Sequence, residues 1–140
     1  GFTLIELLVV VAIIGILAAV GVVAYNGYTA SAKKNATKTM HSQAVKYISA
    51  EIQKCSLGES KFMGTNQDCP ATAAKAVTGA VATMTDKNPF STANNAVRSS
   101  SSFDVGYVSL SSSGTTVTVK TCTATGCATA DKMEATISVD

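Results

Sequence analysis

Residues 7–24 read LLVVVAIIGILAAVGVVA, eighteen consecutive positions without a charged, amide or hydroxyl side chain. A helix of about twenty apolar residues spans the hydrocarbon core of a bilayer, whereas a buried helix of a soluble protein usually keeps a polar face. A secretory signal peptide would place basic residues before the apolar run, but the first basic residue here is Lys33. We therefore expect residues 1–32 to form a retained membrane helix that carries one charge, Glu6.

The helix is expected to continue beyond the apolar run. No proline interrupts the sequence up to Lys54, and apolar side chains recur at positions 36, 40, 44, 45, 48 and 52. That spacing predicts an amphipathic continuation over residues 33–54, and therefore one helix from about residue 2 to residue 54. Five lysines against Glu51 give the continuation a local charge of +4, as expected just outside a bilayer. The single histidine, His41, is expected to be solvated or packed on a sheet rather than to bind a ligand.

Residues 55–140 are expected to form a globular head. Its first part, residues 55–103, gives weak signals: one or two helical turns around 71–84 and otherwise a variable loop. Alternating segments at 104–111, 115–122 and 132–140 predict an antiparallel sheet over residues 104–140. The apolar face of this sheet is expected to carry Val105, Tyr107 or their neighbours, Val117, Val119, Ile137 and Val139. The amphipathic half of the long helix is the expected cover for that face, which gives an α+β fold.

All four cysteines lie in the head, at Cys55, Cys69, Cys122 and Cys127. An even number in a small domain rich in Ser and Thr favours disulfides and an oxidising compartment. The gaps of thirteen and four residues, with the only histidine far away, do not match the paired ligands of a zinc site. Three pairings are open, and we favour Cys55–Cys69 and Cys122–Cys127 because each closes a loop that contains turn residues. No metal or cofactor is expected.

The first thirty residues closely resemble the N-terminal signature of type IV pilins: Gly, then Phe-Thr-Leu-Ile-Glu, then an uninterrupted apolar run. The resemblance implies a fold with one long N-terminal helix packed on a small antiparallel sheet. It also implies that a prepilin peptidase cuts between Gly1 and Phe2 and that Phe2 becomes N-methylated. Because the sequence starts at Gly1, either its numbering retains the last leader residue or processing falls one residue earlier.

The resemblance further implies a homopolymer. Pilin subunits sit in the bacterial inner membrane, are extracted by the inner-membrane pilus assembly machinery, and bundle their apolar helices in the core of an extracellular filament. Such pili on the cell surface serve adhesion, twitching motility or DNA uptake, and this chain would be a major pilin. The alternative is a pseudopilin of a type II secretion system, which carries the same signature. Two expected disulfides and the lack of a dense acidic loop favour the pilus.

Glu6 needs a partner, because a carboxylate in hydrocarbon costs several kcal/mol unless it is paired. The N-terminal ammonium of the same or the next subunit is the natural candidate. A buried charge pair gives little net stability but penalises a misaligned subunit. We therefore expect Glu6 to set the subunit register.

Pilins commonly carry a proline further along the apolar helix, and AAVGVVAYNGY has none. In the family, the helix between the glycine, here Gly15, and that proline often unwinds in the filament. Without the proline, unwinding would depend on Gly15, Gly21 and nearby valines, so we expect it to be weaker or differently placed. Gly15 and Ala19, four residues apart, could also permit close helix approach.

No enzyme is expected. The sequence has no nucleophile–His–acid set and no phosphate loop, and so no small-molecule substrate is expected. DNA binding through Lys33, Lys34 and Lys38 is a weak alternative. These lysines follow the membrane span closely, and we expect them to be buried between subunits.

Overall fold

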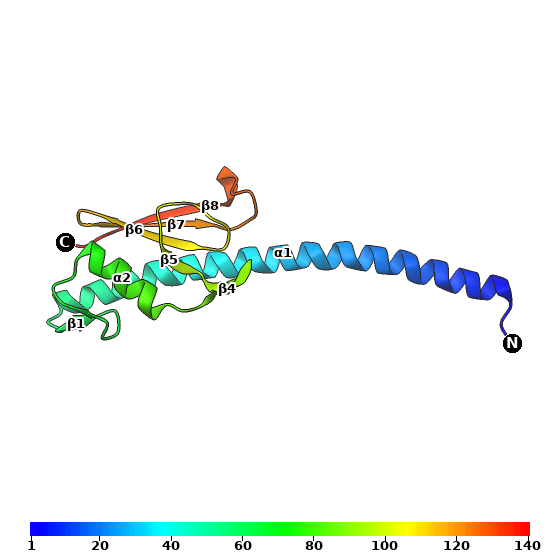
Figure 1. Ribbon diagram of the computed structural model, residues 1–140, viewed down its shortest axis with the longest axis horizontal. Helices are drawn as coiled ribbons and strands as arrows, with labels where there is room; N and C mark the ends of the chain where they lie inside the picture. The colour runs from blue at the N-terminus through cyan, green and yellow to red at the C-terminus, as the bar shows by residue number, and fades with distance from the viewer. The chain divides into compact units, whose positions relative to one another are not determined.

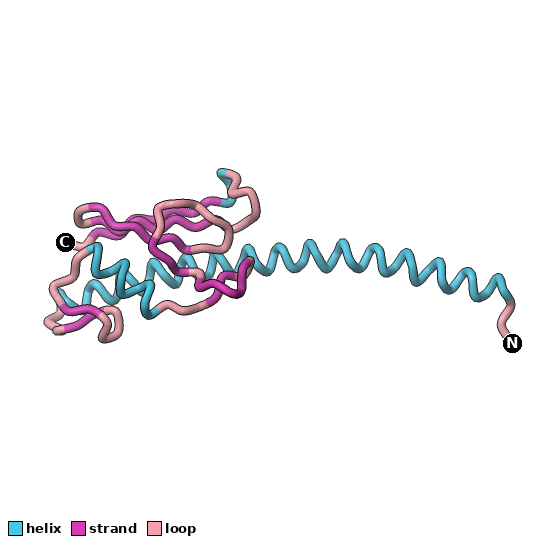
Figure 2. Tube along the Cα trace, in the orientation of Figure 1, coloured by secondary structure: helices cyan, strands magenta, loops and turns pink.

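The long N-terminal helix and the small sheet stand out in a computed structural model that describes all of residues 1–140 (Figure 1, Figure 2). The chain divides into two compact units, residues 1–32 and residues 33–140. Helix α1 (Leu4–Ser56) is continuous and contributes to both units. The predicted fold class is confirmed: a long N-terminal helix is followed by antiparallel strands in an α+β layout that fits a pilin-like fold.

In the second unit, one face of α1 is buried against the head. Its buried side chains are Thr37, His41, Ala44, Ile48, Glu51 and Ile52. The spacing of three and four residues is that of an amphipathic helix. The apolar positions 44, 48 and 52 were expected on this face, but Ala36 is exposed and three polar side chains take part in the burial.

The main sheet has four strands in the order β5-β6-β7-β8: β5 (Val97–Ser99), β6 (Val108–Ser113), β7 (Thr116–Cys122) and β8 (Lys132–Ser138). Strands β6, β7 and β8 form the expected antiparallel meander. Strand β5 pairs with β6 in parallel, so the sheet is mixed at this edge. The buried aliphatic side chains of the meander are Val108, Leu110, Val117, Val119 and Ile137, whereas Val105 and Tyr107 lie before β6 begins and are not buried.

Residues 55–103 contain a helix around 71–84, where one or two helical turns were expected, and short strands where we expected a variable loop. The elements are β1 (Lys61–Phe62), β2 (Gln67–Asp68), α2 (Ala73–Thr83), β3 (Lys87–Asn88) and β4 (Ser91–Asn95), in addition to β5. Strands β1 and β2 form one antiparallel pair, and β3 and β4 form another. The strands from β3 to β5 are short and rich in Asn and Ser, so their own residues give little alternation to detect.

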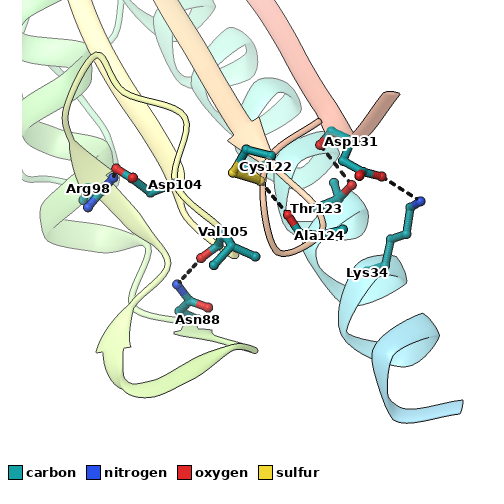
Figure 3. The surroundings of a disulfide bond; sticks show 10 residues. Lys34, Asn88, Arg98, Asp104, Val105, Cys122, Thr123, Ala124 and Asp131 are labelled. Atoms are coloured by element: carbon teal, nitrogen blue, oxygen red, sulfur yellow. Dashed lines mark hydrogen bonds and ion pairs between the residues drawn. A yellow bond between two sulfur atoms is a disulfide. The ribbon is translucent and has the colours of Figure 1, made fainter. Parts of the chain in front are cut away.

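Asn88 explains why β6 starts later than residue 104. Its buried side chain accepts hydrogen bonds from the backbone N–H of Phe90 and Ser91, and its Nδ2 donates to the carbonyl of Val105 over 3.1 Å (Figure 3). Gly106 has φ +78°, and a Cβ there would clash with the Asn88 amide. Only glycine fits at this position, and the chain turns before it enters β6.

Helix α2 completes the core next to α1. The Thr72 hydroxyl caps it by accepting a hydrogen bond from the Lys75 N–H, and its buried side is lined by Ala73, Ala76, Val77 and Ala80. A Cβ at Gly79 would lie 2.5 Å from Cγ of Met63, a fully buried side chain. Gly79 weakens the helix signal in the sequence. Its lack of a side chain allows α2 to approach the β1–β2 turn.

Candidate functional site

The first unit presents an unbroken apolar surface. Residues 1–28 are all exposed, and an 18-residue window of this helix has a mean hydropathy of 3.1 with none of it buried. By length and composition, α1 is the one helix in the structure that could cross a membrane. Its exposed large side chains include Leu8, Ile13, Leu17 and Val23, at 60, 51, 65 and 73%. Exposed apolar surface on this scale marks a membrane or protein interaction site.

The Glu6 carboxylate accepts a hydrogen bond at the start of its own helix. The backbone N–H of Thr3 donates to Glu6 Oε2 over 2.9 Å, and the backbone N–H of Glu6 donates to Thr3 Oγ1 over 3.2 Å. The N–H of Leu7 donates to the Thr3 carbonyl, so Thr3 is the N-cap and α1 begins at Leu4. This reciprocal pair is a capping box, which satisfies two N–H groups that a helix start otherwise leaves free.

Thr3 is the functional residue that our sequence reasoning missed. The signal was present, because a Thr followed three residues later by Glu before an apolar run is the capping-box pattern. In this single chain Glu6 contacts Thr3, and its pairing with an N-terminal ammonium in a polymer stays a prediction. The capping box leaves the second carboxylate oxygen, Oε1, free for such a partner.

The other residues singled out in the first unit lie where a neighbour could reach them. Gly1 and Phe2 precede the helix, and the Phe2 side chain is 89% exposed. Gly15 and Gly21 face open space, since an added Cβ at either would meet nothing within 4 Å. Ala19 lies in a shallow apolar groove on the same helix. The helix is unbroken here in the single chain, so unwinding in a filament stays a prediction.

Two disulfides stabilise the head. Cys55 at the end of α1 is joined to Cys69, and Cys122 at the end of β7 is joined to Cys127. The second bond closes a tight turn before the short helix η1 (Thr129–Asp131). Figure 3 shows the surroundings of Cys122. The backbone N–H and hydroxyl of Thr123 both donate to the carbonyl of Asp131, which holds the two ends of this β7–β8 connection together.

The β7–β8 connection is also held to α1. Lys34 Nζ donates to Asp131 Oδ1 over 3.0 Å, and both side chains are partly buried (Figure 3). Lys33 lies 5.7 Å from the centre of the Phe90 ring. Two of the three lysines considered for DNA binding therefore have partners inside the head, which leaves Lys38 as the free one.

The buried polar groups of α1 have partners elsewhere in the head. His41 Nδ1 lies 2.7 Å from the Thr121 hydroxyl on β7, and burial lowers the pKa of His41. Glu51 Oε1 accepts a 2.6 Å hydrogen bond from the Gly64 N–H, and its Oε2 pairs with Lys54 at 2.6 Å. Burial raises the pKa of Glu51, but these hydrogen bonds and the lysine charge outweigh it and hold the pKa below its usual value. His41 and Glu51 are thus structural groups of the head.

Residues 1–22 match the family model described as the prokaryotic N-terminal methylation motif. This motif is the signature of type IV pilins and pseudopilins. No solved structure matches the chain. The chain therefore carries the pilin and pseudopilin signature on a long apolar helix, followed by an α+β layout that fits the type IV pilin-like fold.

Proposed function

We propose that this chain is the major structural subunit of a type IV pilus. Its apolar helix, residues 1–32, would lie in the bacterial inner membrane before assembly and in the core of an extracellular filament afterwards. The observation that carries the proposal is the exposed apolar surface of residues 1–28, which includes the pilin-type signature at residues 1–22. A surface of this kind needs lipid or other apolar helices around it. A polymer of the same chain supplies the apolar helices.

The processing of the N-terminus follows from the signature. We propose that a prepilin peptidase cleaves after Gly1 and that Phe2 becomes the methylated first residue. The capping box supports this arrangement, because it starts the helix at Leu4 and leaves Gly1 and Phe2 outside the helix. Mass spectrometry of the N-terminal peptide from the native organism tests it: we expect Phe2 as the first residue, with one added methyl group.

Pilus and pseudopilus differ in where the polymer is found. The two disulfides support the pilus, since an exposed fibre gains from cross-links that survive outside the cell. Immunogold electron microscopy with antibodies to residues 33–140 tests the choice on wild-type cells at native expression. We expect labelled surface filaments that disappear when the gene is deleted. A deletion strain that loses protein secretion, with no labelled filaments on the parent, would indicate a pseudopilin instead.

What the filament does for the cell is a further part of the proposal. We propose a role in adhesion, twitching motility or DNA uptake, each of which needs the assembly machinery in the inner membrane. The deletion strain separates these roles through surface attachment, colony-edge spreading and transformation frequency. No change in any of the three would contradict this part of the proposal.

A further inference from the structure

Two lysines of the second unit, residues 33–140, differ from all its other basic side chains. Nine of the eleven basic residues of residues 33–140 contact a carboxylate, a backbone or amide oxygen, or an aromatic ring. Lys38 and Lys46 contact none of these groups, and both are exposed on α1. They are eight residues apart, a rise of about 12 Å along the helix.

These two lysines lie on the side of α1 that faces away from the buried core. We call this side the basic face; its exposed residues are Asn35, Ala36, Lys38, Thr39, Ser42, Gln43, Lys46, Ala50 and Gln53. It carries no acidic side chain. The only acid on α1 after residue 33 is Glu51, which is buried and already paired. The positive charge of the basic face is therefore unbalanced within the chain.

Two of the three unpaired acids of the head lie near the end of α1. Glu59, Asp86 and Asp140 are the acids of the head that form no ion pair. Glu59 is exposed, and its N–H donates to the carbonyl of Lys54 in the last turn of the helix. Asp140 lines a cavity of about 510 Å³ together with Ser56, the last residue of α1. We call Glu59 and Asp140 the acidic tip.

We propose that the basic face of one subunit binds the acidic tip of a second copy of this chain. The inference rests on the proposed polymer and names a contact that sets its register. Lys46 lies ten residues before Ser56, so a shift of one copy by about 15 Å along the helix brings the tip beside the basic face. Because the two surfaces differ and lie apart on the same unit, the contact is heterologous and repeats along a filament.

Charge reversal with rescue tests this contact. The full-length chain is purified in detergent and allowed to assemble by detergent removal, and polymer is measured by sedimentation. We expect Lys46→Glu and Glu59→Lys each to raise the subunit concentration for half-maximal assembly about fivefold, and the double variant to return within about twofold of wild type. Lys87→Glu and Asp86→Lys make the same charge changes elsewhere on the head and are expected to have little effect.

Cross-linking identifies the contact directly. Polymer made from equal parts of isotope-labelled and unlabelled wild-type chain is treated with a carbodiimide, which joins an amine to a nearby carboxylate. We expect a Lys46–Glu59 or Lys38–Glu59 peptide of mixed labelling, which can arise only between two copies. Polymer that forms without this cross-link, and without rescue in the double variant, would overturn the inference alone. Absence of labelled surface filaments on wild-type cells would instead contradict the proposed function on which it rests.

Discussion

Removing the buried carboxylate of Glu51 should destabilise the head while leaving the apolar helix intact. The side chain is 5% exposed and accepts one short hydrogen bond from the Gly64 N–H, in a turn where Met63 and Gly64 both have positive φ. A hydrogen bond to a charged group contributes about 1.5–3 kcal/mol, and the pair with half-exposed Lys54 adds little because solvent screens it. We therefore expect Glu51→Ala to lower the free energy of unfolding by about 2–3 kcal/mol.

Calorimetry of the full-length chain in detergent measures this loss. For a unit of this size, about 1 kcal/mol corresponds to about 4 °C, so Tm should fall by about 8–12 °C. Lys38→Ala is the matched control: it removes an exposed charge from the same helix and should change stability by less than about 0.5 kcal/mol. A Tm for Glu51→Ala no lower than that of the control would refute the reasoning.

The same residue predicts a pH dependence of known sign. Its pKa in the folded head lies below the ordinary value of 4.5, so the folded state holds the ionised form more tightly than the unfolded state does. The stabilisation is complete above about pH 5 and is lost as the pH falls through the folded pKa. Glu51→Gln should therefore be less stable than wild type at neutral pH, and the difference should shrink in acid.

Glu6→Ala should leave the helix content of the detergent-solubilised chain almost unchanged, because one capping hydrogen bond contributes about 1 kcal/mol, but it should make filament rise heterogeneous or abolish filaments; uniform wild-type filaments would contradict the register role. Gly106→Ala should lower Tm by several degrees, since its Cβ would meet the Asn88 amide, and Gly114→Ala, at another positive φ but in open space, should cost less. The pKa of His41 lies below 6.5, so stability should fall as the pH drops from about 7 to about 5, and His41→Gln should flatten that slope in thermal unfolding curves.

The long helix could be predicted from the sequence because its signals are local. The apolar run and the periodic positions 44, 48 and 52 lie within one element, and their burial needs no knowledge of the partner. Thr37 and Glu51 share the same face but were not expected there, whereas the packing of His41 on the sheet was one of the two expected outcomes. His41 and Glu51 are tolerated because Thr121 and Gly64 bring hydrogen-bonding partners from far along the chain. Hydropathy spacing carries no information about such partners.

The head was harder to predict for the same reason. The meander from β6 to β8 alternates clearly, whereas β5 pairs in parallel with β6 after a crossover and is only three residues long. Gly106 and Asn88 act together to end the run that looked like strand from residue 104. At the candidate site, Glu6 could be found because it is the single charged residue of residues 1–32. Its capping partner Thr3 could be found only from the residue order at the helix start.

In the proposed filament, copies of the same helix cover the apolar surface of residues 1–28. A cryo-EM map of filaments sheared from wild-type cells tests it most directly. We predict a core in which residues 4–24 of neighbouring subunits pack together, with Glu6 within hydrogen-bonding distance of an N-terminal amine. A filament whose core is made by the heads, with these residues left facing solvent or detergent, would contradict the account.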